Sequence, residues 1–183
     1  KKRLYPTVYG YGDIDDFFHP NNGVNNDTQY PQSRLNAVHD RINGAGLSMW
    51  CVYYRDDDNA DIARCLNVFD GVAFWFWKEP EEADYHTQIE RFFDDTRDKQ
   101  RMIGCYLYNF GLEKEADPDM VTYQLDNGLE YMRQGLAEGV ILHTNAVGDM
   151  GFRGYKAAKI WTDAHKADRI LFCIAARNQG ASM

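Results

Sequence analysis

Short apolar segments alternate with amphipathic helical segments along most of this chain. Each apolar segment has the length of a strand and is apolar on both faces, as parallel strands buried between helices tend to be. A loop follows each one, and after it apolar residues recur three and four positions apart, which is the period of an α-helix. The strands are expected at 4–12, 47–54, 72–77, 102–108 and 140–145, with a last apolar strand within 169–183. The pattern therefore predicts an α/β protein made of parallel (β/α) units.

The helical segments carry start signals and apolar stripes. Pro31 stands near the start of the first helix, and the fourth helix is opened by the pair Asp117–Pro118, since proline suits the first helical turn. The expected stripes are Leu35, Val38 and Ile42 in the first helix, Ile89, Phe92 and Phe93 in the third, Val121, Leu125 and Leu129 in the fourth, and Ala158, Ile160 and Trp161 in the fifth. These faces should cover the sheet.

The loops that leave the strands are longer than the loops that return to them. A polar stretch at 13–29 follows the first strand, whereas the returns at 43–46 and 137–139 are tight. In barrels and open sheets of parallel strands, ligands bind at the carboxyl ends of the strands. The asymmetry therefore predicts a binding or active face at that end.

Chain length leaves two folds open. A closed eight-stranded barrel takes about 250 residues, whereas this chain has 183 and supplies five units and a sixth strand. The first fold is a partial TIM barrel, which the aromatic strand ends favour, and the alternative is an open doubly wound parallel sheet. We expect residues 1–168 to form one barrel-type domain, incomplete as it stands, and 169–183 to be a terminal strand or tail.

Net charge and hydropathy narrow the range of binding partners that the chain is expected to have. Lysine and arginine number 20 against 28 acidic residues, a net charge of -8, and no basic stripe offsets it. Such a chain repels a phosphate backbone. No apolar run reaches the roughly 20 residues of a membrane span. We therefore expect a soluble chain that binds neither nucleic acid nor membrane.

The sequence carries no cofactor motif. Gly10 and Gly12 lack the third glycine of a dinucleotide fingerprint, and the phosphate-binding GK[ST] pattern does not occur. The four cysteines, Cys51, Cys65, Cys105 and Cys173, are scattered, which favours free core thiols over a disulfide framework or a zinc site. No cofactor and no metal are expected.

Aromatic residues mark the ends of the third and fourth strands. Alternation along 72–77 places Trp75, Trp77 and Glu79 on one face. An indole surface beside a carboxylate suits a sugar cleft, although both tryptophans could instead fill the core while Glu79 starts a helix. Tyr106 and Tyr108 likewise lie on one face of the fourth strand. The adjacent Asn109 could bind a sugar hydroxyl or cap the loop.

Polar residues follow the fifth strand, and acidic residues follow the first two. His143 and Asn145 alternate onto one face of the fifth strand, and Asp149 follows in the loop. At this strand end, His143 is either a structural group or an acid, a base or a ligand. Asp13 and Asp56 lead the two acidic clusters, which are either solvated loop charges or partners of Glu79. Glycoside hydrolysis needs two carboxylates about 5–9.5 Å apart.

Three phrases, FDGVAFWFWKEPEE (69–82), GCYLYNFG (104–111) and EGVILHTNAVGDMG (138–151), the last followed by a helix with KIWTDAH, resemble the carboxyl-terminal units of a glycoside-hydrolase-like TIM barrel of bacterial proteins. The likeness covers roughly 3–165. It implies a sugar-facing cleft, a missing amino-terminal part of the barrel, and a secreted or periplasmic location. The paired carboxylates of a defined hydrolase family have no clear match.

These patterns lead to one hypothesis and two alternatives. The hypothesis is a glycoside hydrolase whose acid and base come from Glu79, Asp149, Asp56 and Asp13, and whose oligosaccharide or glycan partner contacts Trp75, Trp77, Tyr106, Tyr108, Asn109, His143 and Asn145. The first alternative is a non-catalytic carbohydrate-binding or scaffold domain. The second is a metal-dependent sugar isomerase or lyase, for which no tight ligand spacing is found. An incomplete barrel exposes sheet edges, so self-association is also expected.

Overall fold

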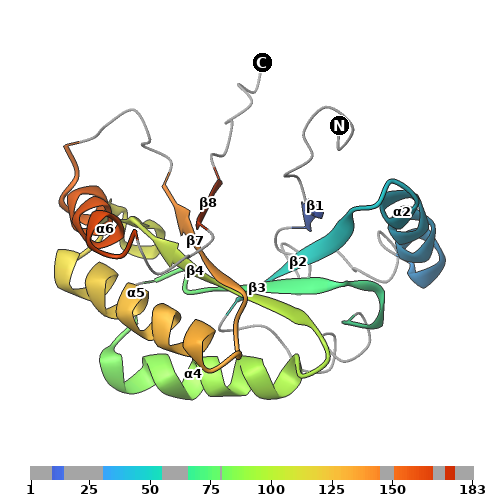
Figure 1. Cartoon of the computed structure of the whole chain (residues 1–183), viewed down its shortest axis with the longest axis horizontal. Helices are drawn as coiled ribbons and strands as arrows, with labels where there is room; N and C mark the ends of the chain where they lie inside the picture. The colour runs from blue at the N-terminus through green and yellow to red at the C-terminus, as the bar shows by residue number, and fades with distance from the viewer. Residues whose placement is uncertain are drawn as a thin grey trace. The chain divides into compact units, whose positions relative to one another are not determined.

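A computed structural model describes residues 10–14, 31–54, 66–78, 80–144, 151–166 and 172–175 (Figure 1), with the backbone alone at 10–14 and 172–175. The chain divides into two compact units. The first comprises Lys1–Phe74 and Ala83–Arg101, and the second comprises Trp75–Glu82 and Met102–Met183.

Among the described residues, the first unit contains two whole strands, nearly all of a third, one whole α-helix and most of another. Its elements are β1 (Gly10–Ile14), α2 (Gln32–Gly44), β2 (Ser48–Tyr54), the short 3-10 helix η2 (Leu66–Val68), β3 (Gly71–Trp75) and α4 (Glu82–Asp95), of which β3 ends and α4 begins in the second unit. In the sheet β2 lies between β1 and β3, and β1 runs parallel to β2. The predicted strand at 47–54 is confirmed as β2, and the strand at 72–77 ends two residues early.

Aromatic packing forms the core of the first unit. Tyr53, Phe74 and Phe92 lie with ring centroids 5.1 to 5.7 Å apart, and each is at most 1% exposed. The hydroxyl of Tyr53 is satisfied, because it donates to Oδ2 of Asp95 at 2.9 Å. Burying three such rings is a large hydrophobic contribution. The stripe predicted for α4 is confirmed.

Helix α2 covers the sheet over a narrower stripe than its sequence predicts. It starts after Pro31, whose extended backbone occupies the N-cap position, as expected for a proline at a helix start. Leu35 is 2% exposed, but Val38 is 40% exposed. The prediction that Val38 belongs to the buried face is therefore wrong. Helix α2 contacts β2, and Leu35 is its buried residue.

The second unit contains parallel strands, a short hairpin and two helices. Its elements are most of β4 (Gln100–Tyr106), β5 (Tyr108–Asn109), the 3-10 turn η3 (Phe110–Leu112), β6 (Lys114–Glu115), α5 (Pro118–Arg133), β7 (Gly139–His143), α6 (Arg153–Ala164) and β8 (Phe172–Ala175). Strand β7 pairs in parallel with β4 on one side and with β8 on the other. The apolar strand predicted within 169–183 is therefore present as β8.

Helices α5 and α6 pack side by side in the second unit (Figure 1). Asp117 caps α5 by accepting the N–H of Asp119 at 2.9 Å, and Pro118 is the first helical residue, as predicted. The stripe of Val121, Leu125 and Leu129 packs in one buried cluster with Val140, Leu142 and Trp161, among others. A 2.6 Å hydrogen bond from Nε1 of Trp161 to Asp126 joins the two helices. Ala158 and Trp161 are buried as predicted for α6, but Ile160 is 70% exposed, so the prediction that Ile160 belongs to the buried stripe is wrong.

These observations confirm an α/β fold with parallel strands, and neither unit closes a barrel among the strands described. Each helix lies between two strands in sequence, as parallel connections require. Cys51 and Cys105 are buried free thiols, as expected. Cys65 and the side chain of Cys173 lie outside the described part.

Candidate aromatic site

Three strands end in aromatic rings that touch one another within the second unit. Trp75 ends β3, Tyr106 ends β4 and His143 ends β7. Their ring centroids are 4.6 Å apart for Trp75 and Tyr106, 5.4 Å for Tyr106 and His143, and 5.9 Å for Trp75 and His143. The register explains one contact, because Tyr106 pairs directly with His143 across the β4–β7 ladder. The sequence predicted all three at this end of the sheet.

A glycine makes room for the indole of Trp75. Gly104 lies two residues before Tyr106 and therefore projects to the same face of β4. A Cβ built at Gly104 would overlap the indole at Cδ2 and Cε3 of Trp75. The missing side chain lets the indole lie against the strand, where Trp75 is 5% exposed.

The chain after β4 folds into a tight hairpin that brings a further ring to the cluster. Strands β5 and β6 pair antiparallel through Tyr108–Glu115 and Asn109–Lys114. Oδ1 of Asn109 accepts the N–H of Leu112 at 3.1 Å, and Glu113 turns the chain in the left-handed conformation with φ of 51°. Phe110 consequently lies at the tip.

Phe110 is the hub of the cluster, and sequence reasoning did not include it among the site residues. Its ring centroid lies 4.7 Å from that of Tyr106, 5.3 Å from that of Tyr108 and 5.8 Å from that of His143. It also stacks on Trp77 at 5.6 Å with an interplanar angle of 24°. The only signal for Phe110 in the sequence was an aromatic residue directly after the strand-end asparagine.

The rings of the cluster differ in how much of each is exposed to solvent. Trp75 is buried, so it can support a ligand but offers little area for contact. Trp77 is 48% exposed, and Leu112 nearby in the hairpin is 56% exposed. Tyr106, Tyr108 and His143 are half-buried. Trp77, whose indole stacks on Phe110, is therefore the most exposed ring of the cluster and the one most accessible to a ligand.

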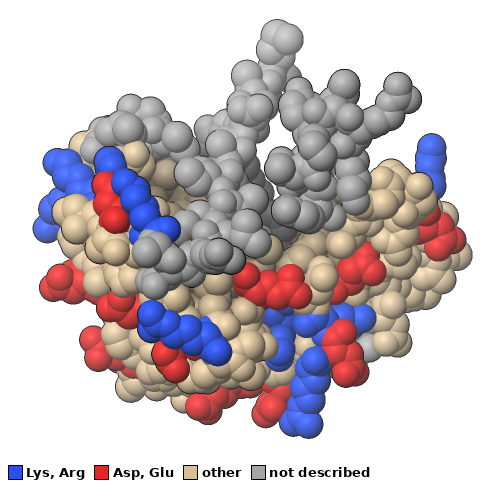
Figure 2. Space-filling view, viewed as in Figure 1, with Lys and Arg blue, Asp and Glu red and all other residues tan. Residues whose placement is uncertain are grey.

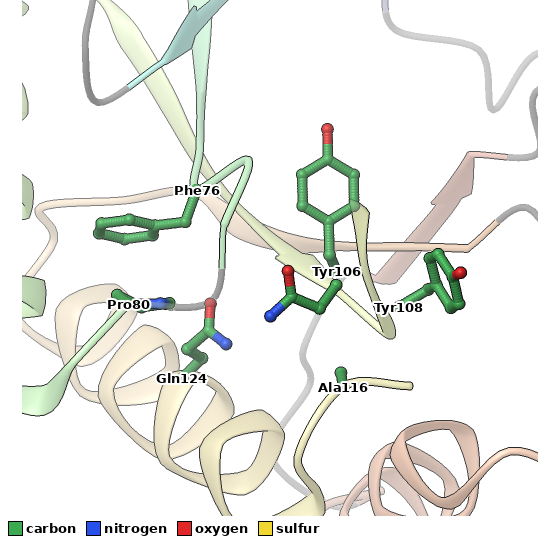
Figure 3. A pocket seen from close by; sticks show the side chains of 7 residues that line it. Phe76, Pro80, Tyr106, Tyr108, Ala116 and Gln124 are labelled. Atoms are coloured by element: carbon green, nitrogen blue, oxygen red, sulfur yellow. The ribbon is translucent and has the colours of Figure 1, made fainter. Parts of the chain in front are cut away.

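Asn109 lies beneath the surface and caps the loop after the strand, which was the predicted alternative to binding a sugar hydroxyl. It is 3% exposed and holds the hairpin turn. With Gln124 of α5 it lines a hollow of about 10 Å³, bounded also by Phe76, Pro80, Tyr106, Tyr108 and Ala116 (Figure 3). That volume suits about one water molecule. A sugar ring is far larger than this hollow and does not fit in it.

The predicted carboxylates lie largely beyond what can be placed. Glu79, Asp56, Asp149 and the predicted binding residue Asn145 fall outside the described residues, and Asp13 has only its backbone described, in β1. Their pairing stays a prediction. Among the residues that are described, no three His, Cys, Asp or Glu side chains gather where a metal ion could be held.

A polar hollow of about 430 Å³ lies in the first unit, at the amino ends of β2 and β3. Its lining includes His39, whose Nε2 is 3.1 Å from Oδ1 of Asp70. Oδ2 of Asp70 accepts the N–H of Met49 at 2.7 Å, so this carboxylate ties α2 to the start of β2. Since the amino ends of parallel strands mostly serve stability, we interpret the pair as structural.

Acidic and basic side chains intermingle on the surface. Figure 2 shows lysine and arginine scattered among aspartate and glutamate over the described part of this face. Several pairs are adjacent on one helix, such as Lys159 and Asp163. In the part of the chain that the structure describes, no helix is long and apolar enough to span a membrane.

Comparisons with protein-family models, with curated proteins and with solved structures found no match to this chain. The geometry of the aromatic cluster is therefore the observation from which a function can be argued.

Proposed function

We propose that the aromatic cluster is a carbohydrate-binding face and that the protein acts on glycosides. The observation that supports it is the stack of half-exposed Trp77 on Phe110, beside the hydroxyl-bearing ring of Tyr106 and the imidazole of His143. A pyranose ring has an apolar face that packs on an indole, and hydroxyls at its edge that hydrogen-bond to polar side chains. Both kinds of group meet here.

The position in the fold agrees with this proposal. Trp75, Tyr106 and His143 are the carboxyl-terminal residues of β3, β4 and β7, and β4 and β7 pair in parallel. Both finer folds that the sequence left open, a partial barrel and an open doubly wound sheet, bind their ligands at that end. The proposal therefore does not depend on which of the two folds is formed.

Trp77 provides the first test. We expect Trp77→Ala to weaken binding of the best oligosaccharide by at least about tenfold, the loss of roughly 1.4 kcal/mol, in isothermal titration calorimetry. A panel of plant, host and microbial oligosaccharides selects that ligand by its effect on thermal unfolding. Ile160→Ala is the matched control, because Ile160 is an equally apolar residue, 70% exposed on α6. Unchanged affinity in Trp77→Ala would contradict the proposal.

Hydrolysis is the reaction we propose for this face, with Glu79 as the acid and Asp149, Asp56 or Asp13 as its partner. We expect Glu79→Gln to abolish cleavage of the bound oligosaccharide while its affinity stays within about twofold, because the amide keeps the shape but cannot give up a proton. Binding without turnover in the unmodified protein would instead identify a carbohydrate-binding domain. Loss of turnover with a chelator, restored by a divalent ion, would identify the metal-dependent isomerase or lyase.

A further inference from the structure

The hairpin is joined through Gly111 to the segment after β3 that carries Trp77. The N–H of Gly111 donates to the carbonyl oxygen of Trp77 at 3.1 Å. The preceding residue, Phe110, stacks on the indole of the same Trp77. One three-residue turn, η3, thus contacts both the backbone and the ring of Trp77.

Gly111 leaves no space for a side chain. A Cβ at this position would overlap Cγ of Lys78 and would lie 3.2 Å from the Cβ of Lys78. The overlap with Cγ is the larger obstacle, because Cγ lies next to the backbone and clears the new Cβ only if Lys78 changes its χ1 angle, whereas the contact with the Cβ of Lys78 is tight but not an overlap. Gly111 is not among the described glycines with positive φ. Close approach, and not backbone freedom, is therefore what requires glycine here.

We propose that Gly111 is a positioning residue of the aromatic site. Its lack of a side chain lets the hairpin turn close on the Trp77–Lys78 segment, and this closure holds the half-exposed indole of Trp77 against Phe110. Pre-positioning a ring in this way spares the cost of ordering it when a ligand binds. The binding consequence rests on the proposed function, whereas the positioning of the indole does not.

The test places an alanine at Gly111 and then removes its obstacle. Protein labelled with 5-fluorotryptophan gives separate ¹⁹F resonances for Trp50, Trp75, Trp77 and Trp161, and the spectrum of Trp77→Phe assigns that of Trp77. We expect Gly111→Ala to shift the Trp77 resonance and to weaken glycan binding by about tenfold, the effect of a small misplacement by overpacking. Adding Lys78→Ala should return both readouts to those of Lys78→Ala alone, because the overlapping Cγ is gone.

Gly44 supplies the control, because a Cβ there meets nothing within 4 Å. Gly44→Ala should leave the Trp77 resonance and the affinity unchanged. An unmoved resonance in Gly111→Ala, or no recovery with Lys78→Ala, would overturn the positioning role. Should Gly111→Ala not fold, recovery of folding by Lys78→Ala supports the steric argument, and failure to recover overturns it. If the resonance shifts and recovers while no variant binds a glycan, the positioning stands and the proposed function fails.

Discussion

Gly104 fixes how closely the indole of Trp75 can approach β4. We expect Gly104→Ala to lower the free energy of unfolding by about 1–3 kcal/mol, the usual cost of forcing an extra carbon into a filled core, because a Cβ would overlap that indole. Urea unfolding followed by circular dichroism measures the change. Gly44→Ala, at the open end of α2, should cause no loss. Equal stability of Gly104→Ala and the unmodified protein would show that the indole moves aside at no cost.

Individual site residues were predictable where strand geometry governs them. Alternation along a strand and the alignment of parallel strand ends were enough to bring Trp75, Tyr106 and His143 together. Phe110 was missed, because its position depends on a turn held by the side chain of Asn109 and by the left-handed Glu113. Such local turn chemistry has no period that a sequence pattern could reveal.

Helix α6 ends in a small network of charges centred on one carboxylate. Asp163 is 2.7 Å from Nζ of Lys159, one turn earlier, and 2.7 Å from Nζ of Lys166, one turn later. Hydrogen bonds from the Lys159 and Lys166 ammonium groups lower the pKa of Asp163 from its usual 3.8 to about 2. Since these groups are exposed, the network is a small contribution to stability and is weakened by salt.

The lowered pKa of Asp163 gives a pH dependence with a definite sign. A carboxyl group whose folded pKa lies below its unfolded pKa stabilises the fold above the unfolded value, near 3.8 here, and this contribution is lost as pH falls towards about 2. We expect the carboxyl ¹³C resonance of Asp163 to titrate near pH 2 at low salt and closer to 3.8 in Lys159→Gln. A midpoint near 3.8 in the unmodified protein would show that the ion pairs do not persist in solution.

Elements with a strong period were the most predictable. The stripes of α4 and α5 and the apolar runs that became β2 and β7 carry many residues each, so chance has little effect on the pattern. The hairpin of β5 and β6 has two residues in each strand, too few for any period, so the sequence predicted only a strand that ends at Tyr108 and a loop beyond it. Val38 shows a different error: the helical period predicted that it is buried, but it is 40% exposed, so the apolar period of α2 is longer than its buried face.

At the scale of the whole molecule, the chain passes between its two compact units in the middle of regular elements. One boundary separates Phe74 from Trp75 within β3, another separates Glu82 from Ala83 at the start of α4, and a third separates Arg101 from Met102 within β4. Domain boundaries normally fall in exposed linkers. A strand that is ordered over one part of its length favours order in the rest, so shared elements couple the stability of the units.

We therefore expect the two units to unfold in a single cooperative transition. Trp50 of β2 reports on the first unit and Trp161 of α6 on the second. One variant retains only Trp50 and another only Trp161, with the other three tryptophans changed to phenylalanine. In each variant, the urea midpoint measured by tryptophan fluorescence should equal the midpoint measured by circular dichroism, which follows the whole chain. In the unmodified protein, which keeps Trp75 and Trp77, a ligand bound at the aromatic site should raise the midpoint of the whole circular-dichroism transition without splitting it, because the ligand stabilises only the folded state. Separate midpoints for the two reporters would show that the shared strands fray at the unit boundary, and a ligand would then protect the second unit alone.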